Sequence, residues 1–468
     1  MRDGEPTTRR RFLSRIGLGI AGGFILGCAH TTERARMGLS SRSRESTAPN
    51  FVLILADDLG YGDIGCYGNA KNKTPHLDRL AREGIRFTDF HANGPMCSPT
   101  RAALLTGQYQ SRFGKVFEGP LSAKTDTHVG LPPQVTTLPE MLKGAGYTTG
   151  MFGKWHLGYQ APHLPTHHGF DEFRGLLTGD GDHHSHISRS GDEDWWHNEQ
   201  IEMETGYSVD LLTQHSIDFM TRNRRRPFFL YVAHLAIHFP WQGPGEKAHR
   251  AKGRDYWNLS KLGPHDEGQV GPVVRQMVEA LDASVGRLMA ALKQLGLEDN
   301  TFVFFASDNG GYLDYGGRYA GEISSNAPCR GQKGEVLEGG HRVPAIAWWP
   351  GRIAPSVTHE TALTMDLLPT YAELAGAAPI EGLDGATLAP LLLDNMPIPK
   401  RDVFWRKDED WAVRRGPWKL VGSGSQMQLF NLDDDISESQ DRATQHPTLV
   451  RDLLAAFREW EQDISASN

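Results

Sequence analysis

Four continuous apolar runs constrain the fold of this 468-residue chain more than any other feature. They read NFVLILADD from residue 50, PFFLYVAH from residue 227, TFVFFASDNG from residue 301 and VPAIAWWPG from residue 343. Each lacks polar alternation, which is typical of strands buried on both faces of a parallel sheet. Amphipathic segments with a terminal glycine lie between these runs. Alternating strands and helices therefore predict a doubly wound α/β domain.

The N-terminal part of the chain differs in character from the rest. Residues 1–28 contain three consecutive arginines, Arg9, Arg10 and Arg11, before a glycine-diluted apolar run that is short for a bilayer span. This segment resembles a twin-arginine export signal, so we expect the export machinery as a partner and a periplasmic or cell-surface location. The stretch ILGC ends at Cys28 like a lipoprotein cleavage site. Lipidation and simple cleavage both stay open, and membrane contact is expected only through such a lipid anchor.

Two folded regions are expected after a polar, charged linker at residues 29–48. Residues 49–394 carry the alternating strands and helices and form the main domain. After about residue 395, the short runs DVFWR, DWAVRRG, PWKLVG and MQLFNL are separated by turn residues, and the amphipathic segment TLVRDLLAAFREWEQD follows them. Residues 395–468 are therefore predicted to form a small antiparallel sheet with one covering helix.

Charge and cysteine content exclude some classes of protein. A formal net charge of -8 argues against nucleic acid as the main partner, because phosphate binding usually requires a basic excess. Four cysteines in 468 residues do not make a disulfide scaffold, so each needs its own explanation. The sequence leaves open whether Cys66 and Cys329 are paired.

Hard oxygen donors follow two of the apolar runs. Asp57 and Asp58 come after FVLILA, and Asp308 and Asn309 come after TFVFFAS. Ligands of open α/β sheets gather at the carboxyl ends of the strands, and adjacent buried carboxylates repel one another unless a cation lies between them. The absence of cysteine or paired histidine among these donors favours calcium or magnesium over zinc. Either pair alone could instead cap the next helix or turn.

A lone cysteine begins the segment CSPTRAALLTG. Pro99 suits the first turn of a helix, so Cys97 is predicted at or just before a helix N-terminus. Unpaired backbone N–H groups and the guanidinium of Arg101 favour a small oxyanion there. The same dipole would activate a nucleophilic thiol. A buried structural cysteine is the alternative.

CSPTRAALLTG matches the C-x-P-x-R signature of the type I sulfatases, which are formylglycine-dependent, arylsulfatase-like enzymes of the alkaline phosphatase superfamily. ADDLGYGDIGCYG, GKWHLG, SDNGG and RGQKGEVLEGGHRVP are similar to other motifs of that family and appear in its order. The resemblance covers the chain from Asn50 to the C-terminal helix. It implies a large mixed, mostly parallel sheet flanked by helices, as in alkaline phosphatase, with a small C-terminal antiparallel sheet and helix. It also places the catalytic centre within residues 49–394.

The resemblance implies a role for each matched residue. A separate maturation enzyme would oxidise Cys97 to formylglycine, whose hydrated aldehyde attacks the sulfur of a sulfate ester. Arg101, Lys154 and Lys333 would surround the sulfate, His238 would help protonate the leaving alcohol, and His156 would take a proton when sulfate is expelled. One calcium ion, with magnesium less favoured, would be held by Asp57, Asp58, Asp308, Asn309 and the side chain derived from Cys97.

The loop LLTGDGDHHSHISRSGDEDWWHNEQ resembles a substrate-binding region of arylsulfatase B-like members, with His183 and His184 replacing two aromatic residues. We therefore expect substrate contacts from Asp182, His183, His184 and His186. The tryptophans of this loop fit a sugar face and packing beneath the loop equally well. The segment EKAHRAKGRDYW at residues 246–257 is basic and suits a polyanionic glycan.

The resemblance implies a sulfuric ester hydrolase that acts on a sulfated carbohydrate or an aryl sulfate. One alternative is a formylglycine-dependent phosphonate or phosphodiester hydrolase, although such relatives tend to carry Asp-His where this chain has Asp308 and Asn309. Another is an inactive exported glycan-binding relative, in which Cys97 would keep its thiol. The natural sugar, exo or endo action and the oligomeric state stay open.

Overall fold

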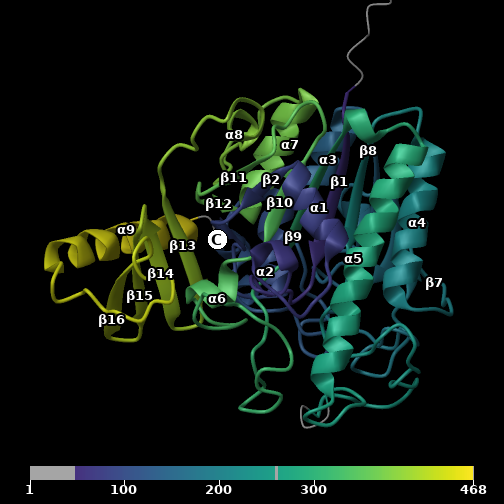
Figure 1. Cartoon of the computed structure of the whole chain (residues 1–468), viewed down its shortest axis with the longest axis horizontal. Helices are drawn as coiled ribbons and strands as arrows, with labels where there is room; N and C mark the ends of the chain where they lie inside the picture. Colours follow the sequence, from purple (N-terminus) through teal and green to yellow (C-terminus); the bar gives the residue numbers. More distant parts are fainter. Residues whose placement is uncertain (1–47, 259–261, 467–468) are drawn as a thin grey trace, which may run out of the picture. The chain divides into compact units, whose positions relative to one another are not determined.

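The computed structural model describes residues 48–258 and 262–466 (Figure 1). The predicted export signal at residues 1–28 lies outside the described residues, as does the predicted linker up to residue 47. Within the described ranges, no helix has both the length and the apolar character that crossing a membrane requires.

A ten-stranded mixed sheet forms the framework of the main domain (Figure 1). Its strands, from one edge to the other, are β11 (Ser356–Thr358), β2 (Ile85–Phe87), β10 (Ala345–Trp348), β9 (Thr301–Ser307), β1 (Asn50–Ala56), β8 (Phe228–Ala233), β4 (Thr148–Lys154), β5 (Glu172–Leu176), β6 (Trp196–His197) and β7 (Gln200–Ile201). The five neighbours from β9 to β5 are parallel, as their continuous apolar runs predict. The expected mixed, mostly parallel sheet is confirmed.

Strand β10 differs from the prediction. Its run reads like a buried parallel strand, but β10 is antiparallel to both neighbours, β9 and β2. A parallel strand needs a crossover that returns the chain to the opposite edge of the sheet. The segment between β9 and β10 instead stays at the carboxyl edge of β9, where it carries Lys333, so β10 starts from that edge. A strand that is buried on both faces is apolar throughout whether it runs parallel or antiparallel to its neighbours, so the sequence pattern does not reveal its direction.

Helices cover both faces of the sheet, and alternate residues of β1 face two separate cores. Phe51 and Leu53 pack in the core under α2, α3, α7 and α8, and Val52 and Ile54 pack in the core under α1, α4 and α5. The helices are α1 (Pro75–Glu83), α2 (Cys97–Thr106), α3 (Leu138–Gly144), α4 (Ser208–Asn223), α5 (Val270–Gln294), α6 (Glu338–His341), α7 (Leu367–Ala375), α8 (Ala389–Asp394) and α9 (Pro447–Ala466). Short 3-10 helices span Gly65–Tyr67, Gln110–Phe113, Lys115–Glu118, Pro165–His168, Glu298–Asn300 and Thr364–Asp366.

A four-stranded antiparallel sheet and α9 follow the main sheet (Figure 1). Its strands are β13 (Asp402–Lys407), β14 (Asp410–Arg415), β15 (Trp418–Ser423) and β16 (Gln426–Asn431). Its core includes Ala103 of α2 and Leu363 of β12 (Ala362–Leu363), which pairs with β3 (Phe90–His91). The predicted small sheet with one covering helix is confirmed, and it shares a core with the helix that begins at Cys97.

Candidate active site

Strand register brings the two predicted groups of oxygen donors together. Ala56 of β1 pairs with Ser307 of β9, so the residues that follow these strands emerge side by side at one edge of the sheet. The amide Nδ2 of Asn309 donates to Oδ1 of Asp58 at 2.8 Å, and the backbone N–H of Asp58 donates to Asp308 Oδ1 at 3.3 Å. These side chains are buried. The acidic strand ends form one cluster, as their positions predict.

Three buried cations compensate this cluster. Arg101 donates from Nε and Nη2 to Oδ2 of Asp308, at 3.0 and 2.8 Å. The Lys154 ammonium lies 2.5 Å from Oδ2 of Asp57, and Lys333 forms an ion pair with Asp58. Arg101 comes from α2, Lys154 from the end of β4 and Lys333 from the loop before α6. With the ends of β1 and β9, five segments far apart in the sequence thus meet at one charged centre.

The pKa values of the carboxylates report how close these charges lie. Burial raises the pKa of Asp57, and the Asp308 carboxylate raises it further, against the opposing charge of Lys154. Burial by itself would also raise the pKa of Asp308. The charges of Arg101 and Lys154 outweigh this effect, so the pKa of Asp308 is lowered. A cluster with opposed shifts of this kind is characteristic of functional sites.

Two buried oxygen atoms indicate that the cluster of acidic strand ends can bind a cation. Oδ1 of Asp57 and Oδ1 of Asn309 have no hydrogen-bond partner among the described residues. Each such atom costs about 1–3 kcal/mol when it is left unpaired. Ligand atoms of Asp57, Asp58 and His238 also lie within 4.8 Å of one another. Carboxylate and amide oxygens are hard donors, so the residues present fit a calcium or magnesium ion.

Cys97 is the first residue of α2 and lies at the floor of the same centre. Met96 precedes it with extended backbone and gives the helix no side-chain cap. The Sγ atom of Cys97 lies 3.2 Å from Nδ1 of His156, whose Nε2 lies 2.8 Å from the carbonyl oxygen of Leu121. The structure therefore places His156 directly beside the side chain at position 97.

Asp58 and His156 both have left-handed backbone, with φ values of 65° and 57°. A non-glycine residue in this region costs of order 1 kcal/mol, and such residues cluster at active sites. Ser98 helps to fix the second of them, because its hydroxyl donates to the carbonyl oxygen of His156 at 2.9 Å.

Burial lowers the pKa values of His156 and His238, and the neighbouring lysines lower them further. Both imidazoles are therefore neutral near pH 7. His238 lies 3.8 Å from Asp58, between its Nε2 and the carboxylate Oδ2. Neutral imidazoles next to a charged centre can accept protons during a reaction.

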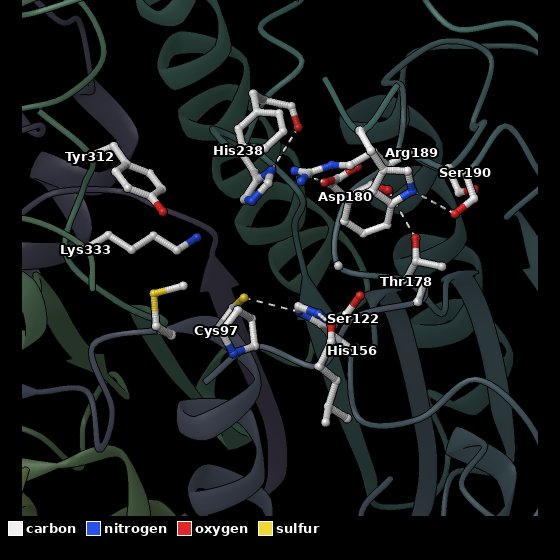
Figure 2. A pocket seen from close by; sticks show the side chains of 18 of the residues that line it. Cys97, Ser122, His156, Thr178, Asp180, Arg189, Ser190, His238, Tyr312 and Lys333 are labelled. Atoms are coloured by element: carbon white, nitrogen blue, oxygen red, sulfur yellow. Dashed lines mark hydrogen bonds and ion pairs between the residues drawn. The ribbon is translucent and has the colours of Figure 1, made fainter. Parts of the chain in front are cut away.

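These groups open into a cavity of about 300 Å³ (Figure 2). In Figure 2, Cys97 lies between His156 and Lys333, and His238 lies across the cavity. Arg101, Lys154 and the acidic strand ends are buried and are not among the described residues that line the cavity. The lining residues are Met96, Cys97, Pro120, Leu121, Ser122, Ala123, His156, Thr178, Gly179, Asp180, Ser188, Arg189, Ser190, His238, Phe239, Trp257, Tyr312, Tyr315 and Lys333.

The histidine-rich loop contributes to the cavity through other residues than those expected. Asp180, Ser188, Arg189 and Ser190 line it, whereas Asp182, His183, His184 and His186 are not among the described lining residues. The Asp182 carboxylate accepts four backbone N–H groups, from His184, Ser185, His249 and Arg250. It holds two loops together instead of facing the cavity.

The three histidines of the loop also have structural contacts. His183 lies 2.8 Å from the Ser208 hydroxyl and 3.1 Å from the carbonyl oxygen of His238. His184 Nε2 lies 3.0 Å from the carbonyl oxygen of Gly243, and His186 stacks on Trp195 with ring centroids 4.1 Å apart. His183 therefore supports the segment that carries His238.

Sequence reasoning missed Asp180, Arg189 and Tyr312, and treated Trp257 only as part of a basic segment. Arg189 and Asp180 lie within the histidine-rich loop from which the sequence predicts substrate contacts. The polar composition of that loop was therefore the sequence feature that could have indicated them. Which of its side chains face the cavity depends on contacts with residues 249–257, more than 50 positions away in the chain.

A second buried cluster contains His91, Glu338 and His341, whose ligand atoms also lie within 4.8 Å of one another. The Lys419 ammonium lies 2.9 Å from Oε1 of Glu338 and 3.0 Å from Nε2 of His341. It also lies 2.9 Å from Oε1 of Glu438. Lys419 and Arg342, whose Nε lies 2.7 Å from Oε2 of Glu338, thus supply the positive charge of this cluster.

Comparison with known proteins agrees with the geometry. The family model described as Sulfatase matches residues 49–377. N-acetylgalactosamine-6-sulfatase of Canis lupus familiaris is 38% identical over 391 residues, which cover 79% of this chain and 71% of the relative. Arylsulfatase A of Homo sapiens is 38% identical over 443 residues, covering 86% of this chain and 81% of the relative.

A solved structure gives the same agreement in three dimensions. Ps i-CgsB, in complex with k-i-k-neocarrahexaose, superposes with a TM-score of 0.77 and 32% identity. The match covers 88% of this chain and 93% of that one.

Proposed function

This chain belongs to the sulfatase family of sulfuric ester hydrolases, and from that premise we propose that it removes sulfate from a sulfated carbohydrate through a formylglycine formed at Cys97. The observation that carries the proposal is the position of Cys97. Cys97 lines the cavity between His156 and Lys333, and its helix also carries Arg101, which pairs with Asp308 of the acidic strand ends.

Formylglycine at position 97 would supply the nucleophilic hydroxyl, and a calcium ion held by Asp57, Asp58, Asp308, Asn309 and the position-97 side chain would supply positive charge beside it. The cationic side chains of the protein supply further positive charge. Arg101, Lys154 and Lys333 are fixed by ion pairs before substrate binds, so they do not reorganise as negative charge develops on the sulfate.

Two histidines are assigned to proton movement. His156, which lies beside position 97, accepts the proton of the remaining hydroxyl when sulfate leaves. His238 lies across the cavity, and its neutral imidazole would relay a proton from the Lys333 ammonium to the oxygen of the leaving alcohol. Different groups thus protonate the leaving alcohol and deprotonate the hydroxyl that remains at position 97.

The names of similar proteins support a carbohydrate substrate. One relative is an N-acetylgalactosamine-6-sulfatase, and Ps i-CgsB was solved with a neocarrahexaose. The cavity of this chain is at the small end of the usual range for ligand sites, about 300–1,000 Å³. A single sulfated sugar unit at the floor fits that size.

Maturation and export complete the proposal. A formylglycine-generating enzyme acts on Cys97 in the cytoplasm before folding, because Cys97 is only 2% exposed in the folded protein. The twin-arginine-like segment with Arg9, Arg10 and Arg11 then directs the folded enzyme out of the cytoplasm. Cell fractionation of the intact chain and of a variant with these arginines replaced by lysines tests this route.

The central experiment joins peptide mass spectrometry across Cys97 with release of sulfate from 4-nitrophenyl sulfate and sulfated sugars. The protein is produced together with a maturation enzyme. We expect the aldehyde at position 97, turnover by the wild type and none by Cys97→Ala. Cys66→Ala, a cysteine change outside the cavity, is the matched control and should retain activity. Turnover by Cys97→Ala would overturn the mechanism.

A further inference from the structure

Arg189 lines the cavity and is held there by contacts with residues other than the acidic strand ends. Its guanidinium carbon lies 4.7 Å from the ring centre of Phe239 and 4.9 Å from that of Trp257. Its Nη2 lies 2.5 Å from Oδ2 of Asp180. Figure 2 shows the guanidinium directed into the space between His238 and Asp180. Two aromatic rings and one carboxylate thus fix a positive charge that faces the cavity.

The carboxylate beside Arg189 does not neutralise it fully. Asp180 is shared with Arg250, whose Nη1 lies 2.6 Å from Oδ1. Two guanidinium groups therefore face one carboxylate, which leaves one positive charge in excess. The Arg250 side chain is 3% exposed, whereas that of Arg189 is 16% exposed and lines the cavity. The excess charge is consequently accessible through Arg189.

A second cation, the exposed Lys124, lies next to this wall but is not among the described residues that line the cavity. The Lys124 ammonium lies 5.6 Å from the ring centre of Trp257, the ring that Arg189 also contacts. Lys124 follows Ser122 and Ala123, which line the cavity. Asp126 in the same loop accepts from the backbone N–H of Ser122 at 2.8 Å. The neutral indole of Trp257, which lines the cavity, therefore contacts two cations.

The side chains around Arg189 lie next to the groups that we assign to the reaction. The Phe239 ring under Arg189 lies 4.4 Å from the His238 ring, measured between ring centres. His238, Lys333 and Cys97 line the same cavity. An anionic group beside Arg189 would therefore belong to the molecule whose sulfate ester reaches position 97.

We propose that Arg189 and Lys124, held around Trp257, form a second anion subsite that binds a carboxylate or a second sulfate group of the saccharide. The proposal rests on the proposed function and narrows its substrate class to saccharides with two negative charges. One charge is the ester that is hydrolysed, and the other is the group held at this subsite.

The test compares Arg189→Met and Lys124→Met with the wild type on matched substrates. These are a monosulfated disaccharide, the same disaccharide with a second sulfate, and the same disaccharide with a uronate carboxylate. We expect Arg189→Met to lower kcat/KM about tenfold to a hundredfold more for one of the doubly charged substrates than for the monosulfated one, because a charge-assisted contact is lost. The substrate with the larger loss identifies the group that is bound.

Two controls make the outcomes distinguishable. Lys252→Met removes an exposed cation that pairs with Glu193, outside the cavity lining, and should not change the ratio between substrates. Lys124 is exposed, so Lys124→Met tests the subsite even if Arg189→Met fails to fold. Equal losses on all three substrates, or no loss in either variant, would overturn the subsite.

Binding to Cys97→Ala separates this proposal from the proposed function. Calorimetry with the three disaccharides measures the second subsite without turnover. If the wild type hydrolyses no sulfate ester while Cys97→Ala binds the doubly charged saccharide more tightly in an Arg189-dependent manner, the proposed function fails and the subsite stands. Equal affinity for all three saccharides would contradict the subsite alone.

Discussion

At the residue scale, Arg101 connects the helix that begins at Cys97 to both the acidic strand ends and β4. Its Nε and Nη2 hold Asp308, and its Nη1 donates to the carbonyl oxygen of Lys154 at 2.7 Å. Lysine has the same charge but lacks the planar fork that makes these three contacts simultaneously. The three contacts of Arg101 therefore require both the positive charge and the planar shape of a guanidinium group.

We therefore predict that Arg101→Lys folds but lowers kcat/KM on 4-nitrophenyl sulfate by about 10–100-fold, the range typical when a residue that positions a metal-binding carboxylate is changed. Steady-state kinetics measure the loss, and circular dichroism checks the fold. Lys252→Met is the control. A loss below threefold in a folded Arg101→Lys protein would show that the fork is dispensable.

The unpartnered oxygens of Asp57 and Asn309 lead to a second prediction. Removing the divalent cation with EDTA should lower the melting temperature and abolish sulfate release, because the clustered carboxylates then repel one another. Calcium should restore both, and Asn309→Ala should need more calcium for the same thermal shift. An unchanged melting curve on chelation, checked by elemental analysis for complete removal, would contradict the assignment.

At the element scale, α6 and β15 are joined by a buried polar network. Lys419 of β15 contacts Glu338 and His341 of α6, and His341 stacks on Trp405 of β13 with ring centroids 4.0 Å apart. The loop that carries Lys333 leads directly into α6. The small sheet therefore supports one end of an active-site loop.

We predict that Lys419→Met lowers the free energy of unfolding by about 3–5 kcal/mol, the usual cost of removing one partner from a buried ion pair. The matched change Lys407→Met, at the exposed pair with Asp408, should cost less than about 1 kcal/mol. Urea unfolding measures both values. Similar losses in the two variants would show that the network contributes no more than a surface pair.

Asp89, near the buried network, gives a prediction for pH. Burial raises its pKa, but Arg342 and Arg414 outweigh burial, and the pKa lies well below its ordinary value. A carboxylate with a lowered folded pKa stabilises the fold above its unfolded pKa, about 3.9, and loses this contribution as pH falls through the folded value. Asp89→Asn should therefore be less stable than the wild type at pH 6. The difference should shrink below about pH 4, as urea unfolding across pH can measure. A constant difference would contradict this linkage.

At the scale of the whole molecule, the small sheet and the main domain share a core. Ala103 of α2 and Tyr109 pack among residues of β13 to β16 and α9. The indole Nε1 of Trp405 donates to the carbonyl oxygen of Ala92 at 2.9 Å, close to the segment that leads to Cys97. The boundary proposed at residues 394 and 395 separates two sheets but not two independent cores.

A chain that ends at Asp394 should consequently fail to fold into an active enzyme. Truncation exposes the apolar surface around Ala103 and Leu363, and exposed surface of this kind favours aggregation. Soluble yield and thermal unfolding of the truncated and full chains measure the effect. A soluble, active fragment with one sharp transition would show that the small sheet is dispensable.

The sequence by itself determined the local features of this protein. Continuous apolar runs specify buried strands, proline and glycine mark the ends of helices, and Cys97 lies at a helix start, because these signals depend only on neighbouring residues. The acidic residues at the ends of two strands follow from the same local pattern. The motifs and their order were sufficient for the family.

Only the tertiary structure decided the direction of β10 and the choice of loop residues that face the cavity. A strand buried on both faces has the same pattern in either direction, so the path of the preceding chain sets its direction. Asp182 and Arg189 lie in one polar loop, yet one binds backbone N–H groups of a distant loop and the other lines the cavity. Contacts between segments far apart in the sequence make that choice, and no local pattern encodes them.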